Sequence, residues 1–297
     1  MKQIKGTITP GYFPNTKPHY ELLDGLRGVA ALLVVIYHIF EGLAFAEATD
    51  GVGSGLITTL NHGHIAVDFF FILSGFVISY AYDDRWGKMS IGGFFKRRLI
   101  RLHPMLIMGS VIGAITFFAV GCERWDGSIT PTSWVMIAML LTMFMIPAVP
   151  GVPYEVRGNG EMFPLNGPSW SLFFEYIGNI LYAFVLRRIG KVALAVLTAC
   201  AAFCTLDLCL NMNVFGLLTS GRDAQMYTVI GGWSLTSEQI YIGFTRLLYP
   251  FLSGLLVSRI GKTINVKGGF WWCSLILTAI FCIPCVGGEG SILNGVF

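Results

Sequence analysis

Charged side chains are scarce in this sequence: lysine, arginine, aspartate and glutamate make up 12% of its 297 residues. A soluble globular domain has about one quarter, so this chain lacks the polar surface that a water-soluble fold needs. Hydrophobic residues make up 54% of the chain, and the mean hydropathy is +0.67. The composition therefore predicts an integral membrane protein, with the lipid bilayer as its surroundings.

Other features that the sequence lacks exclude further classes. There is no basic run interleaved with aromatic residues, so nucleic acid is not an expected partner. No histidine stands at metal-ligand spacing from a cysteine, and no metal is expected. The seven cysteines lie mostly in apolar runs, where cysteine behaves as a small hydrophobe. Cys282 and Cys285 have the spacing of a redox motif, but they lack its strand–helix context.

Eight stretches are apolar and close to the length of about 20 residues that a membrane-spanning helix needs. They are residues 22–46, 65–82, 102–120, 133–149, 170–186, 192–210, 239–257 and 270–286. No soluble domain, low-complexity linker or internal repeat separates them. Residues 1–297 are therefore predicted to form one all-α domain, a polytopic transmembrane helical bundle.

Basic residues cluster at 2–17, 85–101, 187–191 and 259–267. Because positive loops stay in the cytoplasm, all four clusters, and with them the N-terminus, are predicted to be cytoplasmic. Three apolar stretches separate the second cluster from the third, and an odd number of crossings cannot return the chain to the same side. Either one stretch is re-entrant, or a span is missed, or the charge rule fails there. A cleaved secretory signal is disfavoured because charged residues crowd the first apolar run.

That first stretch carries Asp24, Arg27 and His38. Ionisable residues at bilayer depth are costly and usually face a bundle interior or a cavity. At about 100° per residue, all three fall on one stripe of a helix, with His38 about 16 Å deeper than Arg27. The stripe fits a snorkelling arginine with a hydrogen-bonded histidine, and it equally fits a general base near neutral pH.

The second stretch begins with His62 and His64, continues with Asp68 and reaches the small pair Ser74–Gly75. The two histidines resemble a metal pair, but loop histidines are more often solvated. Asp68 is placed to pair with a cation of the first stretch, or else to lie at the membrane interface. The small pair allows close helix approach.

Two more polar groups follow. Arg98 and Arg101, three residues apart on one helix face, suit the phosphates of a nucleotide-bearing donor, although topogenic charge explains such clusters as well. Farther on, Pro168 and Ser169 mark the start of a helix that carries Glu175, a carboxylate that is costly to bury unpaired.

Together these groups resemble the membrane-bound acyltransferase 3 family, polytopic bacterial enzymes that acylate cell-surface glycans. The resemblance covers residues 22 to about 182. It consists of LDGLRG at 23–28 with His38 following, VDFFFILSGF at 67–76, RLIRLHP at 98–104 and SWSLFFE at 169–175. It implies an enzyme of the bacterial cytoplasmic (inner) membrane that moves an acyl group from acyl-CoA to a carbohydrate hydroxyl. Acetyl-CoA is the expected donor by its frequency in the family.

The resemblance also assigns roles. His38 is expected to be the general base or, less favoured, the atom that is transiently acylated. Arg98 and Arg101 are expected to hold the donor, and Arg27 to assist them. The family has about ten spans where eight are visible here, so the sequence is expected to be a fragment.

The remaining polar motif residues receive supporting roles. Asp24, Asp68 and Glu175 are candidate orienters of the histidine or the arginines, without a specific pairing. Ser74, Ser169 and Trp170 are assigned to substrate binding.

Two other functions compete with acyl transfer. Proton-coupled transporters and flippases of lipid- or sugar-linked substrates also place ionisable residues in the membrane, but they often show inverted repeats, which are not seen here. A purely structural bundle could use the same residues to join helices. Release of free thiol from an acyl-CoA separates an enzyme from both.

Overall fold

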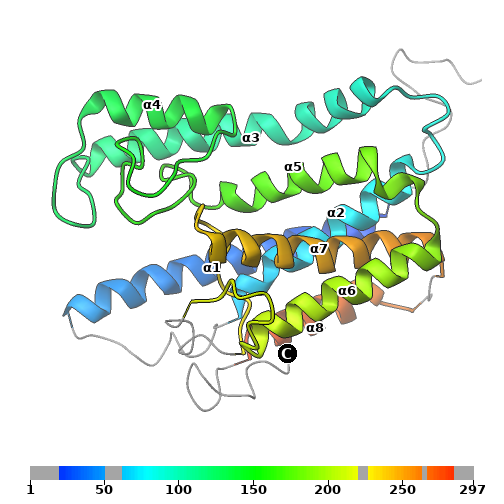
Figure 1. Cartoon of the computed structure of the whole chain (residues 1–297). Coiled ribbons are helices and arrows are strands. Elements are labelled where there is room, and N and C mark those ends of the chain that lie inside the picture. Colours follow the sequence, from blue (N-terminus) through cyan, green and yellow to red (C-terminus); the bar gives the residue numbers. More distant parts are fainter. Residues whose placement is uncertain (1–19, 51–61, 220–226, 263–265, 284–297) are drawn as a thin grey trace, which may run out of the picture.

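The computed structural model describes residues 20–50, 62–219, 227–262 and 266–283. Within these ranges the chain forms eight α-helices and two single-turn 3₁₀ helices, and no strand is present (Figure 1). The helices are α1 (Glu21–Asp50), α2 (Ala66–Tyr82), α3 (Ile91–Ala119), α4 (Thr132–Met143), α5 (Ser169–Phe184), α6 (Lys191–Cys209), α7 (Ser237–Ile260) and α8 (Gly269–Phe281), with η2 (Gly63–Ile65) and η3 (Leu186–Arg188) between them. The predicted helical bundle is thus confirmed. The basic N-terminal cluster and Cys285 lie outside the described residues.

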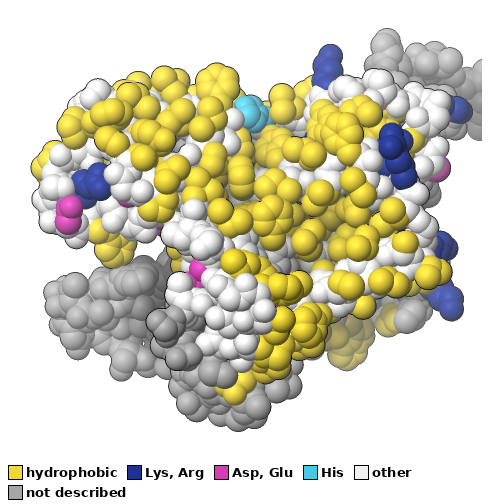
Figure 2. All heavy atoms as spheres, in the orientation of Figure 1, with side chains coloured by type: hydrophobic (Ala, Val, Ile, Leu, Met, Phe, Trp, Pro, Cys, Tyr) yellow, Lys and Arg dark blue, Asp and Glu magenta, His cyan; other side chains and the backbone are white. Residues whose placement is uncertain are grey.

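Six of the described helices, all except α4 and α8, contain segments long and apolar enough to cross a membrane. Large apolar side chains are exposed on their outer faces, for example Ile100, Met105 and Ile115 along α3. Figure 2 shows hydrophobic side chains over much of the visible surface. A surface of this kind is costly in water and favourable against lipid tails, so it supports the membrane assignment.

The apolar stretch at 133–149 does not form a full span, contrary to the prediction. α4 has 12 residues and ends at Met143, which gives a helix about 18 Å long. Met145 takes a left-handed conformation, with φ of 57°, and Pro147 and Pro150 follow, so the helix cannot continue. α4 packs on the distal half of α3, and the chain then returns before α5 begins (Figure 1). A re-entrant α4 therefore accounts for the odd number of apolar stretches.

The third helix is longer than predicted, because it begins at Ile91 rather than near residue 102. Ser90 caps it, with the hydroxyl accepting a hydrogen bond of 3.0 Å from the amide of Gly93. The extra turns contain the basic cluster that ends at Arg101. Lysine and arginine are good helix formers whose heads can reach water from the end of a span, so an apolar window underestimates such a helix.

The connections α2–α3, α5–α6 and α7–α8 lie at one end of the bundle, here called the basic end. Asp83, after α2, accepts a hydrogen bond of 2.8 Å from Nε of Arg259 near the end of α7. The same guanidinium donates to the carbonyl oxygens of Leu186 and Ile189, between α5 and α6. Most of the Lys and Arg side chains visible in Figure 2 gather at this end. The basic clusters in these three connections therefore share one side, as the charge pattern predicts.

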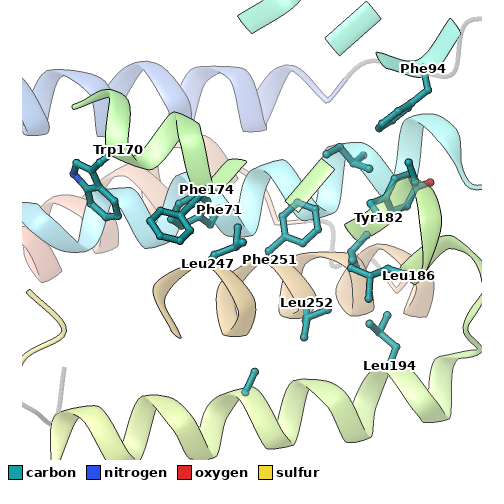
Figure 3. Close-up of a cluster of buried hydrophobic side chains, with 14 of the residues drawn as sticks. Phe71, Phe94, Trp170, Phe174, Tyr182, Leu186, Leu194, Leu247, Phe251 and Leu252 are labelled. Atoms are coloured by element: carbon teal, nitrogen blue, oxygen red, sulfur yellow. The ribbon is translucent and has the colours of Figure 1, made fainter. Parts of the chain in front are cut away.

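The core of the bundle lies between α2, α5 and α7, where aromatic and leucine side chains interdigitate; Figure 3 shows Phe71, Phe174, Leu247 and Phe251 among them. Two glycines let α2 and α7 approach closely. A Cβ at Gly75 would collide with the carbonyl oxygen of Phe251, and one at Gly254 would collide with that of Ile72. The small residue predicted to allow close helix approach thus lies at the crossing of α2 and α7.

Candidate active site

Glu175 joins three helices inside the bundle. Its Oε1 accepts a hydrogen bond of 2.7 Å from Nη2 of Arg98 on α3, and one of 2.9 Å from the hydroxyl of Ser74 on α2. The Arg98 side chain is 3% exposed and that of Glu175 is 20% exposed. Charge-assisted hydrogen bonds of this length are strong. The carboxylate, costly if left alone, is therefore stabilised where α2, α3 and α5 meet.

Two further cations belong to the same site. Arg27 on α1 interacts electrostatically with Arg101 and Glu175, and its Nη1 lies 3.7 Å from Oδ1 of Asp24. Arg98 in turn interacts with Arg27 and Arg101. We refer to these three arginines as the arginine cluster. Its three positive charges are accompanied by the carboxylates of Asp24 and Glu175, so the group has an excess of one positive charge.

The members of the arginine cluster differ in what they can bind. Arg98 points into the bundle, Arg27 is half-buried and Arg101 is exposed. The Nε of Arg98 is buried and has no hydrogen-bond partner among the described residues. A buried donor without a partner is uncommon in native structures and indicates a place for a water or a ligand. The arginine pair predicted from sequence is therefore split into an inward and an outward member.

A second buried ion pair lies farther toward the opposite end. Nη2 of Arg246 on α7 is 2.8 Å from Oδ2 of Asp68 on α2, and it also donates to the carbonyl oxygen of His64 at 2.6 Å. Nη1 donates to the carbonyl oxygen of Gly231 at 3.0 Å, and Nε lies 3.4 Å from Oδ1 of Asp68. The Arg246 side chain is 2% exposed. Asp68 therefore pairs with Arg246, not with the His38 or Arg27 considered from sequence.

The residues assigned to substrate binding are largely buried. The ring of Trp170 lies against the guanidinium of Arg246, with 5.0 Å from its centroid to Cζ, a cation–π contact. Ser169, the first residue of α5 after Pro168, is buried as well. The hydroxyl of Ser74 donates its hydrogen bond to Glu175. Trp170 and Ser74 thus make contacts that join helices, and Ser169 is buried at the start of α5.

His38 lies on α1 three turns beyond Arg27, and its side chain is exposed. The residue before it, Tyr37, packs on η2: a Cβ at Gly63 would overlap the Tyr37 side chain. The Tyr37 and His38 rings are in an edge-to-face arrangement with centroids 5.3 Å apart. The predicted base is thus beside the turn that precedes α2, and Arg27, the member of the arginine cluster on α1, lies nearer the basic end of that helix.

The histidines before α2 are not solvated loop residues. His62 is buried, and its Nδ1 makes a hydrogen bond of 2.8 Å with the carbonyl oxygen of Ile283 after α8. The His62 and His64 rings are 6.1 Å apart. In the part of the chain that the structure describes, no group of three or more His, Cys, Asp or Glu side chains is arranged to hold a metal ion.

Sequence reasoning missed two functional-looking residues that carried a usable signal. Arg246 is the only charged residue between Glu238 and Arg259, and Asp207 is isolated in the apolar run of α6. The fully buried Asp207 accepts a hydrogen bond of 2.6 Å from Tyr241 and one from the amide of Val214. An isolated charge at membrane depth indicates a buried partner in both cases.

Comparisons with known proteins identify a family for this helical bundle. The chain matches a family model for an acyltransferase domain over residues 20–292. It is 32% identical over 173 residues to protein 2 in the picA locus of Rhizobium radiobacter, which covers 54% of this chain and 80% of that protein. It is 32% identical over 186 residues to acyltransferase MdmB of Streptomyces mycarofaciens, covering 61% of this chain and 42% of MdmB.

A Staphylococcus aureus (strain COL) protein, provisionally named an O-acetyltransferase, is 33% identical over 99 residues, or 32% of this chain and 14% of that protein. The chain thus spans less than half the length of two of these three relatives. No solved structure matches it. Because the family match extends over most of the chain, this protein belongs to the acyltransferase 3 family of membrane enzymes, which transfer acyl groups other than amino-acyl groups.

Proposed function

We propose that this chain is an O-acyltransferase of the bacterial cytoplasmic membrane, with its N-terminus and basic end in the cytoplasm. As a single membrane domain it would move an acyl group, acetyl by frequency in the family, from acyl-CoA to a hydroxyl of a cell-surface or exported carbohydrate. The observation that carries the proposal is the arginine cluster, in which the buried Nε of Arg98, beside Arg27 and Arg101, has no hydrogen-bond partner among the described residues. Guanidinium groups suit the phosphates of a coenzyme A donor.

The cluster and His38 fit two parts of one donor. Coenzyme A carries its phosphates and its thioester at opposite ends of an extended pantetheine arm. Arg27 and His38 lie on the same helix, about 16 Å apart along its axis. Phosphates held at the arginine cluster would leave the arm to run along α1 toward His38. Holding the donor in this way replaces a bimolecular encounter by a positioned one.

In the transfer step, His38 takes the proton of the acceptor hydroxyl as its oxygen attacks the thioester carbon. The carbon–sulfur bond breaks, an ester forms, and coenzyme A leaves as a thiol after it receives a proton. Asp68 and Glu175 are engaged by Arg246 and Arg98. We therefore assign these carboxylates to holding arginines, and Asp24 to orienting Arg27.

The test uses the purified chain in lipid nanodiscs with radiolabelled acetyl-CoA and a soluble hydroxyl acceptor. Wild-type protein is expected to give labelled ester and free coenzyme A. The His38→Ala variant is expected to insert at normal abundance and to give neither product. A carrier would bind the donor without releasing thiol. Ester formation by His38→Ala at the wild-type rate would remove His38 from the mechanism.

A further inference from the structure

A pocket of about 370 Å³ lies outside the arginine cluster, at the end of the bundle opposite the basic end. It is formed by the connection between α3 and α4, by Trp134 in the first turn of α4, and by Pro153. α3 runs from the basic end along the bundle, so this connection lies at its far end (Figure 1). Ligand pockets have volumes of about 300–1,000 Å³, and this one is large enough for a small molecule.

Hydrogen bonds hold the connection in a defined shape. The amide of Arg124 donates to the carbonyl oxygen of Ser128 at 2.8 Å, and that of Gly127 donates to Arg124 at 2.9 Å. Within this turn, Oδ1 of Asp126 accepts hydrogen bonds from the amide and the hydroxyl of Ser128, at 2.9 and 2.6 Å. Such a side-chain cap is typical of a stable Asx turn.

Residues of the segment between α4 and α5 also hold the connection in place. The amide of Trp125 donates to the carbonyl oxygen of Arg157 at 2.9 Å, and the hydroxyl of Thr130 donates to that of Val156 at 2.8 Å. Both bonds join the connection to the chain that returns from α4. The pocket wall is thus fixed before any ligand binds, which lowers the entropic cost of binding.

The pocket has no excess of positive charge, because its one arginine lies near two carboxylates. Oδ2 of Asp126 lies 4.0 Å from Nε of Arg124, whose Nη2 lies 4.0 Å from Oε2 of the buried Glu155. The hydrogen bonds from Ser128 lower the pKa of Asp126, so this exposed carboxylate is ionised at neutral pH. Because the cation here is matched by carboxylates, a phosphate or another anion is a poor occupant. Charged and hydroxyl groups in the lining disfavour a hydrocarbon tail as well.

The remaining chemistry suits a carbohydrate. The indole of Trp134, half-buried against the neighbouring core, offers an apolar ring for the C–H face of a sugar. Asp126 and Arg124 offer an acceptor and a donor for neighbouring hydroxyl groups. We propose that this pocket binds the carbohydrate acceptor, an inference that rests on the acyl-transfer function proposed above. Donor and acceptor then reach the bundle from opposite ends.

The experiment measures steady-state acetylation of p-nitrophenyl glycosides of glucose, galactose, mannose and N-acetylglucosamine by the nanodisc-embedded chain. Trp134→Ala is expected to raise the KM for the accepted glycoside about tenfold, from the lost ring contact. Asp126→Asn keeps the turn, since its Oδ1 still accepts from Ser128, and is expected to raise that KM about threefold to tenfold. The KM for acetyl-CoA should not change in either variant.

The matched controls lie on the same turn outside the pocket lining. Trp125→Ala and Glu123→Gln remove an exposed indole and an exposed carboxylate, and both should keep the wild-type KM. If the wild-type chain acetylates a glycoside and the pocket variants match their controls, the pocket assignment is overturned and the transfer function stands. If the wild-type chain acetylates none of the four, the carbohydrate acceptor itself is contradicted, and the pocket assignment falls with it.

Discussion

The Arg246–Asp68 and Arg98–Glu175 pairs both join helices inside this bundle, and they differ in how many guanidinium nitrogens have a protein acceptor. All three nitrogens of Arg246 have protein acceptors, and Trp170 covers the group. Arg98 gives Nη2 to Glu175, while its buried Nε is without a partner in the described part of the chain. A saturated guanidinium can only hold structure. One with a spare donor beside two other arginines can also hold a ligand.

The Arg246 pair is the place where a single substitution should do most damage to the fold. Arg246→Met leaves Asp68 buried without its cation and removes the donor to two backbone carbonyls. Breaking a buried ion pair costs about 3–5 kcal/mol. We expect a large fall in the melting temperature of the detergent-solubilised protein. Size-exclusion chromatography of heated samples measures this temperature. Arg188→Ala, an exposed cation at the basic end, is the control, and an equal melting temperature for the two variants would make the pair dispensable.

The Arg98 pair is expected to separate stability from activity. Arg98→Met leaves Glu175 without its cation, but Ser74 still donates to this partly exposed carboxylate, so the loss of stability should be about 1–3 kcal/mol. The double variant Arg98→Met with Glu175→Gln removes both charges and should recover most of that stability. Acetyl transfer should be lost in the single variant and should not return in the double variant. Recovery of transfer together with stability would show that Arg98 is only structural, as Arg246 is.

The sequence predicts which segments form helices better than it predicts where those helices begin and end. Apolar length predicted the membrane helices, because a bilayer requires about 20 apolar residues per crossing. It overestimated the length of α4, where Met145 and the nearby prolines end the helix. It underestimated α3, where basic residues extend the helix beyond the apolar window. In both cases the deciding factor was local backbone and side-chain reach rather than hydrophobicity.

The candidate site was predictable as a set of residues but not as a set of pairs. Motif resemblance selected Arg98, Asp68 and Glu175, yet their partners depend on how α2, α3, α5 and α7 pack. Nothing in the local sequence shows that Asp68 faces α7 or that Glu175 faces α3. Arg246 was within reach of sequence reasoning, since a lone charge in an apolar helix requires a buried partner. Searching the apolar stretches for every isolated charged residue would have found Arg246.

The smallest expected effect is at Arg101, the exposed member of the arginine cluster. Arg101→Ala should leave the melting temperature close to that of the wild type, because an exposed cation contributes little to stability. Its loss should raise the KM for acetyl-CoA about tenfold, the equivalent of one charge-assisted contact to a phosphate. Steady-state kinetics with Arg188→Ala as control measures the difference. Added salt should weaken donor binding by the wild type more than by Arg101→Ala, since screening acts on the contact that the variant lacks. Equal KM values for Arg101→Ala and Arg188→Ala would show that Arg101 does not bind the donor. Arg27 and Arg98 would then be sufficient for donor binding.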